Sequence, residues 1–234
     1  FHIQPQYDFK HQLIGGEVLI RWVSQKRGFV SPAEFIPLAE SVNLIHKITQ
    51  VVIEKSFSWL SENQKNLAED FHLSLNLSAD DLYEPNLMDY IAGCAQRHGV
   101  SAGRVVFEVT ETASSKKMNA FVDAIISIKA SGYGVALDDF GTGYSSLSYM
   151  QMMQPDIVKI DMSFVRDIDK SFINKKIITA ICQMASSTEA KTVAEGIETM
   201  AEYQELEALG VDYIQGYLKG KPVPMSDFVD TYVT

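Results

Sequence analysis

Four short apolar segments of this chain end in a carboxylate. They are Val105–Glu108, Val135–Asp139, Ile157–Asp161 and Thr192–Glu195. Runs of this length and composition predict buried strands. If the strands lie side by side and parallel, their terminal acids meet at one edge and repel one another. Such a cluster needs cations, so the pattern predicts a metal site and favours an enzyme.

Predicted helices separate these strands, and the alternation continues along the whole chain. We predict strands at residues 2–8, 17–22, 71–77, 104–110, 134–138, 157–160, 191–195 and 212–216. We predict helices at residues 49–65, 80–97, 115–130, 145–152, 172–187 and 198–209, and from about 226. A further helix should run from a capping box at Ser31–Glu34, with Pro32 at its first position, toward His46.

The number of predicted strands favours a barrel over an open sheet. About eight strands with intervening helices in 234 residues match a single-domain α/β fold of the (β/α)8 type. The connection near Lys10–Gln12 is too short for a crossover, so the first two strands should pair antiparallel. One of these two strands then runs opposite to the rest of the barrel.

Composition narrows the possible partners. A net charge of −10 disfavours binding to nucleic acid polymers, and no apolar run is long enough to cross a membrane. Cys94 and Cys182 show no metal-binding spacing, which is typical of reduced thiols in a cytoplasmic protein. The chain starts at Phe1 without an initiator methionine, so we expect a module of a longer protein. That protein could be a sensor anchored in a membrane.

Polar residues lie at the predicted strand ends, and strand ends form the active-site face of a parallel barrel. These residues are Glu17, Arg21, Asn76, Glu108, Glu111, Asp138, Asp139, Lys159, Asp161, Glu195, Glu198 and Gln215. The set offers oxygen ligands without cysteine or histidine, which favours Mg²⁺ or Mn²⁺ over zinc or copper. The adjacent Asp138 and Asp139 could serve two ions, and two ions can activate water and hold a phosphoryl oxygen. Glu17 is unusual because it lies at the start of its predicted strand.

Each signal also has a simpler interpretation. A single acid at a strand end commonly caps a helix or forms an ion pair, and Lys159 could be only the counter-ion of Asp161. Glu111 and Glu198 each follow a predicted ligand by three residues, which favours a role in bracing loops. The metal-site hypothesis therefore depends on the acids as a group.

Eight motifs of the chain resemble those of the EAL-domain family, phosphodiesterases that hydrolyse the bacterial second messenger cyclic di-GMP. The motifs are EVLIRW at 17–22, SPAEFIPLAE at 31–40, NLS at 76–78, FEVTE at 107–111, DDFGTGYSSLSYM at 138–150, KID at 159–161, AEGIET at 194–199 and QGYLKGKPVP at 215–224. The resemblance runs from Gln4 to Pro222. It implies a TIM-like barrel whose first strand is antiparallel to the others.

The resemblance also implies roles for individual residues. The expected metal ligands are Glu17, Asn76, Glu108, Asp138, Asp139 and Glu195. We expect catalysis to depend on Lys159, near the attacking water, together with Glu17, Asp138, Asp139 and Glu195. Substrate contacts are expected from Gln4, Arg21, Asp161, Glu198 and Gln215. Glu111 is expected to hold the loop that begins at Phe140, which belongs to the usual dimer contact of the family.

The implied reaction is hydrolysis of one phosphodiester bond of cyclic di-GMP to linear pGpG, with two Mg²⁺ or Mn²⁺ ions as cofactors. Ca²⁺ should inhibit, because its looser coordination suits a two-ion site poorly. The expected partners are cyclic di-GMP and a second copy of the chain. The chain departs from the family pattern at Val18, Met162 and Lys219, and none of these changes removes a predicted ligand.

Two other functions are compatible with the residues. A cyclic di-GMP receptor without catalysis could use the same fold, although such proteins usually lose ligands that this chain keeps. A retaining glycosidase could use Glu108 and Glu195 as its two carboxylates. That alternative leaves Lys159 and the Asp138–Asp139 pair without a role.

Overall fold

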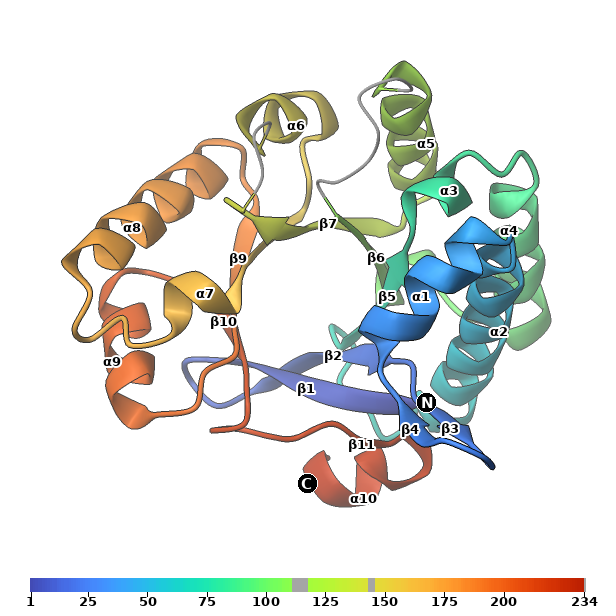
Figure 1. Ribbon diagram of the computed structural model, residues 1–234, viewed down its shortest axis with the longest axis horizontal. Helices are drawn as coiled ribbons and strands as arrows, with labels where there is room; N and C mark the ends of the chain where they lie inside the picture. The colour runs from blue at the N-terminus through green and yellow to red at the C-terminus, as the bar shows by residue number, and fades with distance from the viewer. Residues whose placement is uncertain (111–117, 143–145, 234) are drawn as a thin grey trace.

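A computed structural model describes residues 1–110, 118–142 and 146–233. Within these residues, eight strands close into a barrel, and Figure 1 looks along it. In order around the barrel they are β1 (His2–Asp8), β2 (Leu13–Leu19), β5 (His72–Leu77), β6 (Val105–Thr110), β7 (Gly134–Phe140), β8 (Ile157–Ile160), β9 (Lys191–Glu195) and β10 (Tyr213–Gln215). Pairing of β10 with the end of β1 closes the ring, and the short β11 (Val223–Pro224) pairs with the start of β1.

The directions of the strands confirm the predicted fold. β1 pairs antiparallel with β2 and β10, whereas the pairs from β2 through β5 to β10 are parallel. The register places Gln4 opposite Glu17 on the two antiparallel strands. The first half of β1 therefore reaches the same mouth as the C-terminal ends of the other strands.

Helices surround the barrel (Figure 1). The longer ones are α2 (Ile45–Asn63), α4 (Leu87–His98), α5 (Met118–Ala130), α6 (Ser146–Met153), α8 (Phe172–Ser187) and α9 (Met200–Ala208). Other helices around the barrel are short: α3 (Ala79–Leu82), α7 (Met162–Val165), α10 (Phe228–Tyr232), η1 (Ala102–Arg104) and η3 (Met225–Asp227). The core lies between helices and barrel, where outward-facing strand residues such as Leu73, Phe107 and Leu137 are fully buried. In the described part of the chain, none of the helices has both the length and the apolarity needed to cross a membrane.

Inside the barrel, an apolar layer and a polar layer of side chains lie one above the other. The apolar layer, further from the mouth, consists of Val106, Ala136, Ile157 and Val193, with Tyr213 packed against it. Side chains of a strand alternate between faces, so residues two positions further along point to the same side. Those residues are Glu108, Asp138, Lys159, Glu195 and Gln215. The apolar cluster thus forms the floor beneath a polar layer that faces the mouth.

The predicted bounds of the second strand are wrong, and with them the predicted position of Glu17 at its start. Strand β2 spans Leu13–Leu19 rather than residues 17–22, so Glu17 lies in its second half like the acids of the other strands. Trp22 instead begins a separate hairpin of β3 (Trp22–Ser24) and β4 (Gly28–Val30). The start of β2 was not predicted because it contains Gly15 and Gly16, and glycine is uncommon in strands.

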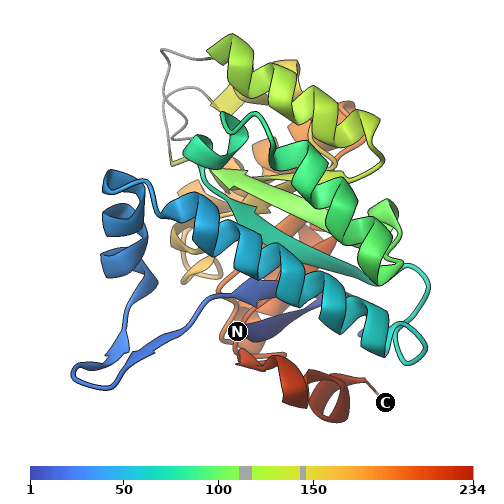
Figure 2. The same ribbon diagram turned by 90° about the vertical axis from the view of Figure 1, so that its right-hand side faces the viewer.

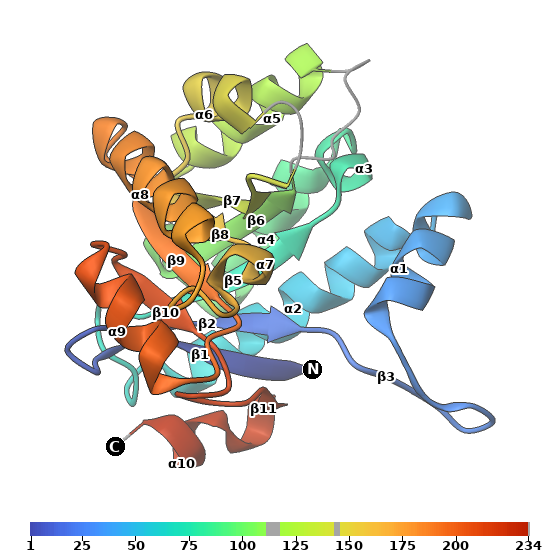
Figure 3. The ribbon, with the colours of Figure 1, turned by 60° about the vertical axis from the view of Figure 1, so that its left-hand side comes forward.

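The hairpin and helix α1 (Pro32–Ser41) extend from one side of the barrel, as the blue segments of Figures 2 and 3 show. The helix expected to run toward His46 stops at Ser41, and α2 begins at Ile45. Asn43 between them has a positive φ of 55°, which a continuous helix excludes.

Two further helix predictions are wrong in detail. Ser31 caps α1 with Pro32 in the first turn, but its side chain makes no capping hydrogen bond. Glu34, the expected partner in a capping box, pairs with Arg27 of the hairpin loop at 2.5 Å instead. The single helix predicted at 80–97 is divided into α3 and α4, and Pro85 lies in the break between them.

Candidate active site

Lys159 of β8 lies at the centre of a ring of acids. Its Nζ atom lies 2.6 Å from Glu108 Oε2, 2.7 Å from Glu195 Oε1, 3.2 Å from Asp138 Oδ1 and 3.6 Å from Glu17 Oε2. The lysine is only 1% exposed. The structure therefore brings together acids from four strands that are far apart in the sequence. Among the described residues, Lys159 pairs with these carboxylates rather than with Asp161.

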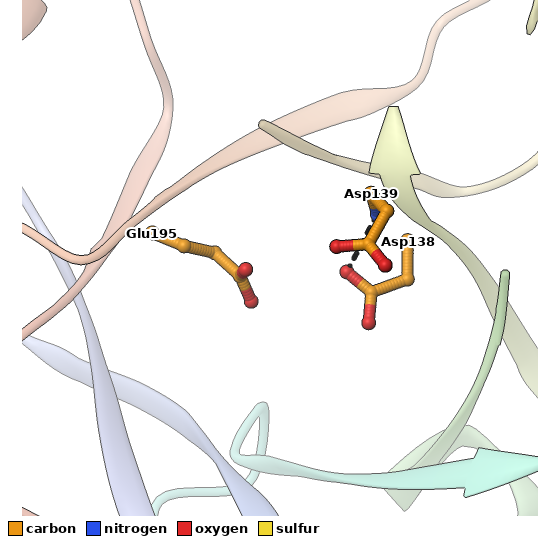
Figure 4. Close-up of side chains that lie close together, drawn as sticks. All are labelled: Asp138, Asp139 and Glu195. Carbon is orange, nitrogen blue, oxygen red and sulfur yellow. Dashed lines mark hydrogen bonds between the residues drawn. The ribbon is translucent and has the colours of Figure 1, made fainter. Parts of the chain in front are cut away.

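Asp139 joins this ring beside Asp138. The carboxylate oxygens of Asp138, Asp139 and Glu195 lie within 4.8 Å of one another. Figure 4 shows Glu195 reaching from its strand toward the two aspartates at the end of β7. Consecutive strand residues normally face opposite sides, but the pairing of β7 with β8 shifts register between Leu137 and Phe140. Asp139 also has a φ of 54°, and its N–H donates to Asp138 Oδ1 at 2.9 Å. This irregularity turns both carboxylates toward the mouth.

Amide side chains hold Glu17 in place. Asn76 Nδ2 donates to Glu17 Oε1 at 2.8 Å, and Gln215 Nε2 donates to Glu17 Oε2 at 2.6 Å. Gln215 Nε2 also lies 3.3 Å from Gln4 Oε1. Gln6, which is not among the residues predicted for the site, donates through Nε2 to Gln215 Oε1 at 2.7 Å. Its position two residues after Gln4, on the same face of β1, was the available signal.

Burial and mutual repulsion shift the pKa values of most acids in the ring upward. Burial raises the pKa of Glu195 to about 8 and that of Glu108 well above its ordinary value, although Lys159 opposes both shifts. Burial also raises the pKa of Asp139. For Glu17, burial acts in the same direction, but Lys159 and the two amide hydrogen bonds outweigh it and lower the pKa. The pKa of Lys159 is well above its ordinary value because the acids, Glu108 foremost, outweigh burial.

The ring suits a hard divalent cation. One amine cannot balance the charge of five neighbouring carboxylates, so the ring must bind protons or cations. Glu108 Oε1 is buried and has no hydrogen-bond partner among the described residues, which leaves a lone pair free for an ion. All candidate donors are carboxylate or amide oxygens, which Mg²⁺ and Mn²⁺ prefer. The residues present therefore fit the expected metal.

Two cavities meet at the ring. A cavity of about 370 Å³ is lined by Gln4, Lys159, Glu195, Gln215 and Tyr217, among others. A second cavity of about 580 Å³ is lined by Arg21, Asn76 and Asp80, among others. Glu17 and Leu19 line both cavities. A further groove of about 590 Å³ beside α1 is mostly apolar and includes none of the acids of the ring.

The remaining predicted site residues lie at the periphery. Arg21 follows β2 and lines the larger cavity, where its Nη1 donates to Ile20 O at 2.9 Å. Asp161 caps α7 by accepting from the Ser163 N–H at 3.0 Å. Glu198 lines the smaller cavity and pairs with Arg166 at 2.8 Å. Glu111 lies outside the described residues. The substrate-binding roles of Arg21, Asp161 and Glu198 and the loop-holding role of Glu111 stay predictions.

Known proteins match nearly the whole length of the chain. The family model for the EAL domain matches residues 1–222. The chain is 33% identical over 228 residues to the bifunctional diguanylate cyclase/cyclic di-GMP phosphodiesterase MucR of Pseudomonas aeruginosa, covering 95% of this chain and 33% of that protein. It is 33% identical over 218 residues to the cyclic di-GMP phosphodiesterase PdeB of Shewanella oneidensis, covering 93% of this chain and 25% of that protein.

A similar fold occurs among solved structures. The structure described as PaMucR phosphodiesterase in complex with c-di-GMP matches with a TM-score of 0.91 and 32% identity. The match covers 97% of this chain and 92% of that chain. By contrast, this chain spans only about a third of the length of the first curated relatives, at 31% and 33%.

Proposed function

The chain belongs to the EAL domain family, and from this premise we propose that it hydrolyses cyclic di-GMP to linear pGpG. The observation that carries the proposal is the ring of carboxylates around Lys159. A phosphodiesterase must bind an anionic substrate, and an acidic ring can do so only when cations mask its charge. The names of the relatives support the choice of substrate.

We propose that two Mg²⁺ or Mn²⁺ ions bind at the ring. The residues that would hold them are Glu17, Asn76, Glu108, Asp138, Asp139 and Glu195. When bound, such ions lower the pKa of water and withdraw charge from phosphoryl oxygens. The Asp138, Asp139 and Glu195 oxygens are already close enough to share one ion.

The side chains of the site have separate tasks in this proposal. Lys159, held as an ammonium by the surrounding acids, donates hydrogen bonds that orient the attacking water or offset charge on the phosphate. Hydrolysis releases a proton from that water. We propose that Asp138 or Asp139, which lie at the mouth, accepts it.

The two cavities suggest how the substrate lies. Cyclic di-GMP has two identical nucleotide halves, and the cavities on the two sides of Glu17 could each take one. In the smaller cavity, Gln4 and Gln215 present amides that can hydrogen-bond to a base or a ribose. In the larger cavity, Arg21 can pair with a phosphate. Substrate contacts by Asp161 and Glu198 remain part of the proposal.

The alternative functions have less support. A receptor without catalysis is expected to lack metal ligands, whereas this chain keeps all six predicted ligand residues. A glycosidase would gain nothing from Lys159, whose amine lies 2.6 Å from one of the two required glutamates and 2.7 Å from the other. We further propose a cytoplasmic homodimer whose contact includes the loop after β7. If the chain is part of a longer protein, as its relatives are longer, we propose the same hydrolytic activity for that protein.

A direct assay tests the proposed function. The chain is incubated with cyclic di-GMP and Mn²⁺, with and without a chelator, and the nucleotides are separated. We expect pGpG to form with Mn²⁺ and not when a chelator removes it. The Glu195→Ala and Glu17→Ala variants should form no pGpG. Glu34→Ala, which alters an exposed ion pair outside the ring, is the matched control and should keep the activity. Intact cyclic di-GMP with Mn²⁺ present, or full activity in Glu17→Ala, would refute the proposal.

A further inference from the structure

Asp81 is a buried carboxylate outside the ring of acids. It lies in α3, directly after the strand that carries Asn76, and is only 1% exposed. A carboxylate at this depth is stable only when it is well hydrogen-bonded. Asp81 forms a capping box with Ser78 at the start of α3, but this helix has only four residues, and the carboxylate also contacts α2. The bonds of Asp81 therefore point to another task.

The carboxylate of Asp81 connects α2 with the end of β5. On one side, Thr49 Oγ1 donates to Asp81 Oδ2 at 2.8 Å, and His46 Nδ1 lies 2.9 Å from Asp81 Oδ1. On the other side, Oδ2 accepts from Ser78 N at 3.0 Å and from Ser78 Oγ at 2.8 Å. Ser78 Oγ in turn accepts from Asp81 N at 3.1 Å. Ser78 is thus held through both its backbone and its side chain.

Ser78 follows Asn76 by two residues, and Leu77 between them is buried in the core. Fixing Ser78 therefore fixes the direction in which the strand end presents Asn76. Asn76 Nδ2 donates to Glu17 Oε1 at 2.8 Å, so a small shift of the strand end would displace Asn76 and loosen this contact between two expected ligands. Residues behind a metal ligand commonly control how well it binds the ion.

We propose that Asp81 is a positioning residue that holds Asn76 against Glu17 through Ser78 and thereby sets the affinity of the acid ring for divalent cations. This inference rests on the proposed metal-dependent function. It assigns α2 a part in the site, because Thr49 and His46 anchor the carboxylate from that helix. Asp81 and Thr49 also line the larger cavity, so binding of the metal alone, without substrate, is the measurement that isolates this role.

The first test measures Mn²⁺ binding in the absence of substrate, from the paramagnetic signal of free Mn²⁺. We expect Asp81→Asn to weaken binding by about 10- to 100-fold, the range typical of residues that orient metal ligands. Asp212→Asn is the matched control. Asp212 Oδ2 accepts from Thr192 N and Thr192 Oγ1, both at 3.0 Å, and holds the start of β9 at the opposite end of the barrel. We expect this control to bind Mn²⁺ like the wild type, even if it unfolds more readily.

A double-mutant cycle separates positioning from simple loss of charge. If Asp81 acts through Asn76, Asp81→Asn should have no further effect on Mn²⁺ affinity in an Asn76→Ala background. Equal losses in both backgrounds would mean that Asp81 acts by its charge and would overturn the proposal. Thr49→Val removes one anchor without changing charge, and we expect a smaller loss of affinity in the same direction. It also replaces Asp81→Asn if that variant fails to fold.

The outcomes distinguish the two proposals. Unchanged Mn²⁺ affinity in both Asp81→Asn and Thr49→Val, with a wild type that binds Mn²⁺ and hydrolyses cyclic di-GMP, overturns the role of Asp81 alone. A wild type that neither binds Mn²⁺ nor hydrolyses the dinucleotide overturns the proposed function and this inference with it.

Discussion

Lys159 Nζ lies 2.6 Å from Glu108 Oε2, and both side chains are only 1% exposed. The ammonium of Lys159 is stable at this depth because acids, Glu108 foremost, surround it. Removing one partner of such a pair leaves an uncompensated buried charge and typically destabilises a protein by about 3–5 kcal/mol. Three further acids lie around the same amine, so the lysine is the main counter-charge of the ring in the absence of metal.

The first prediction concerns Lys159→Met. Without metal at pH 8, we expect it to lower the free energy of unfolding by about 3 kcal/mol, because the remaining acids repel one another. The loss should be smaller at pH 5.5, where protonation of the acids relieves the repulsion. Urea denaturation at both pH values in the presence of a chelator measures the difference. An equal loss at the two pH values would contradict this account of the ring.

A second prediction concerns Gln6, the buried amide behind Gln215. Gln6→Leu removes the 2.7 Å hydrogen bond that orients Gln215 toward Glu17. One hydrogen bond is worth about 0.5–1.5 kcal/mol, so we expect kcat/KM to fall about 2- to 10-fold. Gln183→Leu changes an exposed glutamine of α8 in the same way and should leave kcat/KM unchanged. A fall of equal size in both variants would show that the effect is not specific to the site.

The third prediction is a pH dependence of stability that comes from His72. Burial lowers the pKa of His72 from 6.5 to about 4, and its Nε2 has no hydrogen-bond partner among the described residues. Between these values the unfolded chain binds the proton and the folded chain does not, so stability falls as the pH drops. This histidine alone should remove about 2 kcal/mol between pH 7.5 and pH 5.

His72→Gln isolates that contribution. Its own stability at pH 7.5 is irrelevant to the test, since only the change with pH is compared. We expect the free energy of unfolding of the wild type to fall about 2 kcal/mol more than that of the variant over this pH range. Parallel pH profiles for the two proteins would mean that His72 is protonated normally in the folded state.

A fourth prediction concerns Ca²⁺. The ion prefers six to eight oxygen ligands at about 2.3–2.6 Å, whereas Mg²⁺ requires compact octahedral geometry. We therefore expect Ca²⁺ to compete for the ring and to support hydrolysis more slowly than Mn²⁺. Rates of pGpG formation in mixtures of the two ions provide the measurement. Equal rates with either ion alone would remove the argument from coordination geometry.

The sequence predicted those parts of the fold that depend on local pattern. Strands β8 and β9 have the predicted bounds, because each is a short apolar run next to a polar end. Strand β2 was misplaced because its glycines serve contacts that the sequence does not reveal. A Cβ at Gly15 would lie 2.7 Å from the His72 carbonyl oxygen, and one at Gly16 would lie 2.5 Å from Ile3 Cγ2. These close approaches exist only once the barrel has closed.

In the site too, features of the local sequence could be predicted, whereas contacts between distant strands could not. Acids at strand ends were recognisable because parallel strands bring them to one face. The sequence could not show that Lys159 would contact four acids at once, since this depends on the register of strands up to 142 residues apart, from Glu17 to Lys159. The supporting residues Gln6 and Asp81 were missed for a similar reason. Their partners come from distant elements, and a lone glutamine or aspartate carries no chemical signature by itself.

The central claim is that the ring binds divalent cations, and a calorimetric Mn²⁺ titration at pH 7 tests it most directly. We predict two ions per chain, with weaker binding in Glu195→Ala. Because the pKa of Glu195 is raised to about 8, binding should also release protons, which buffers of different ionisation enthalpy would detect. A wild-type chain that takes up no Mn²⁺, or a Glu195→Ala variant that binds it as tightly as the wild type, would contradict the account.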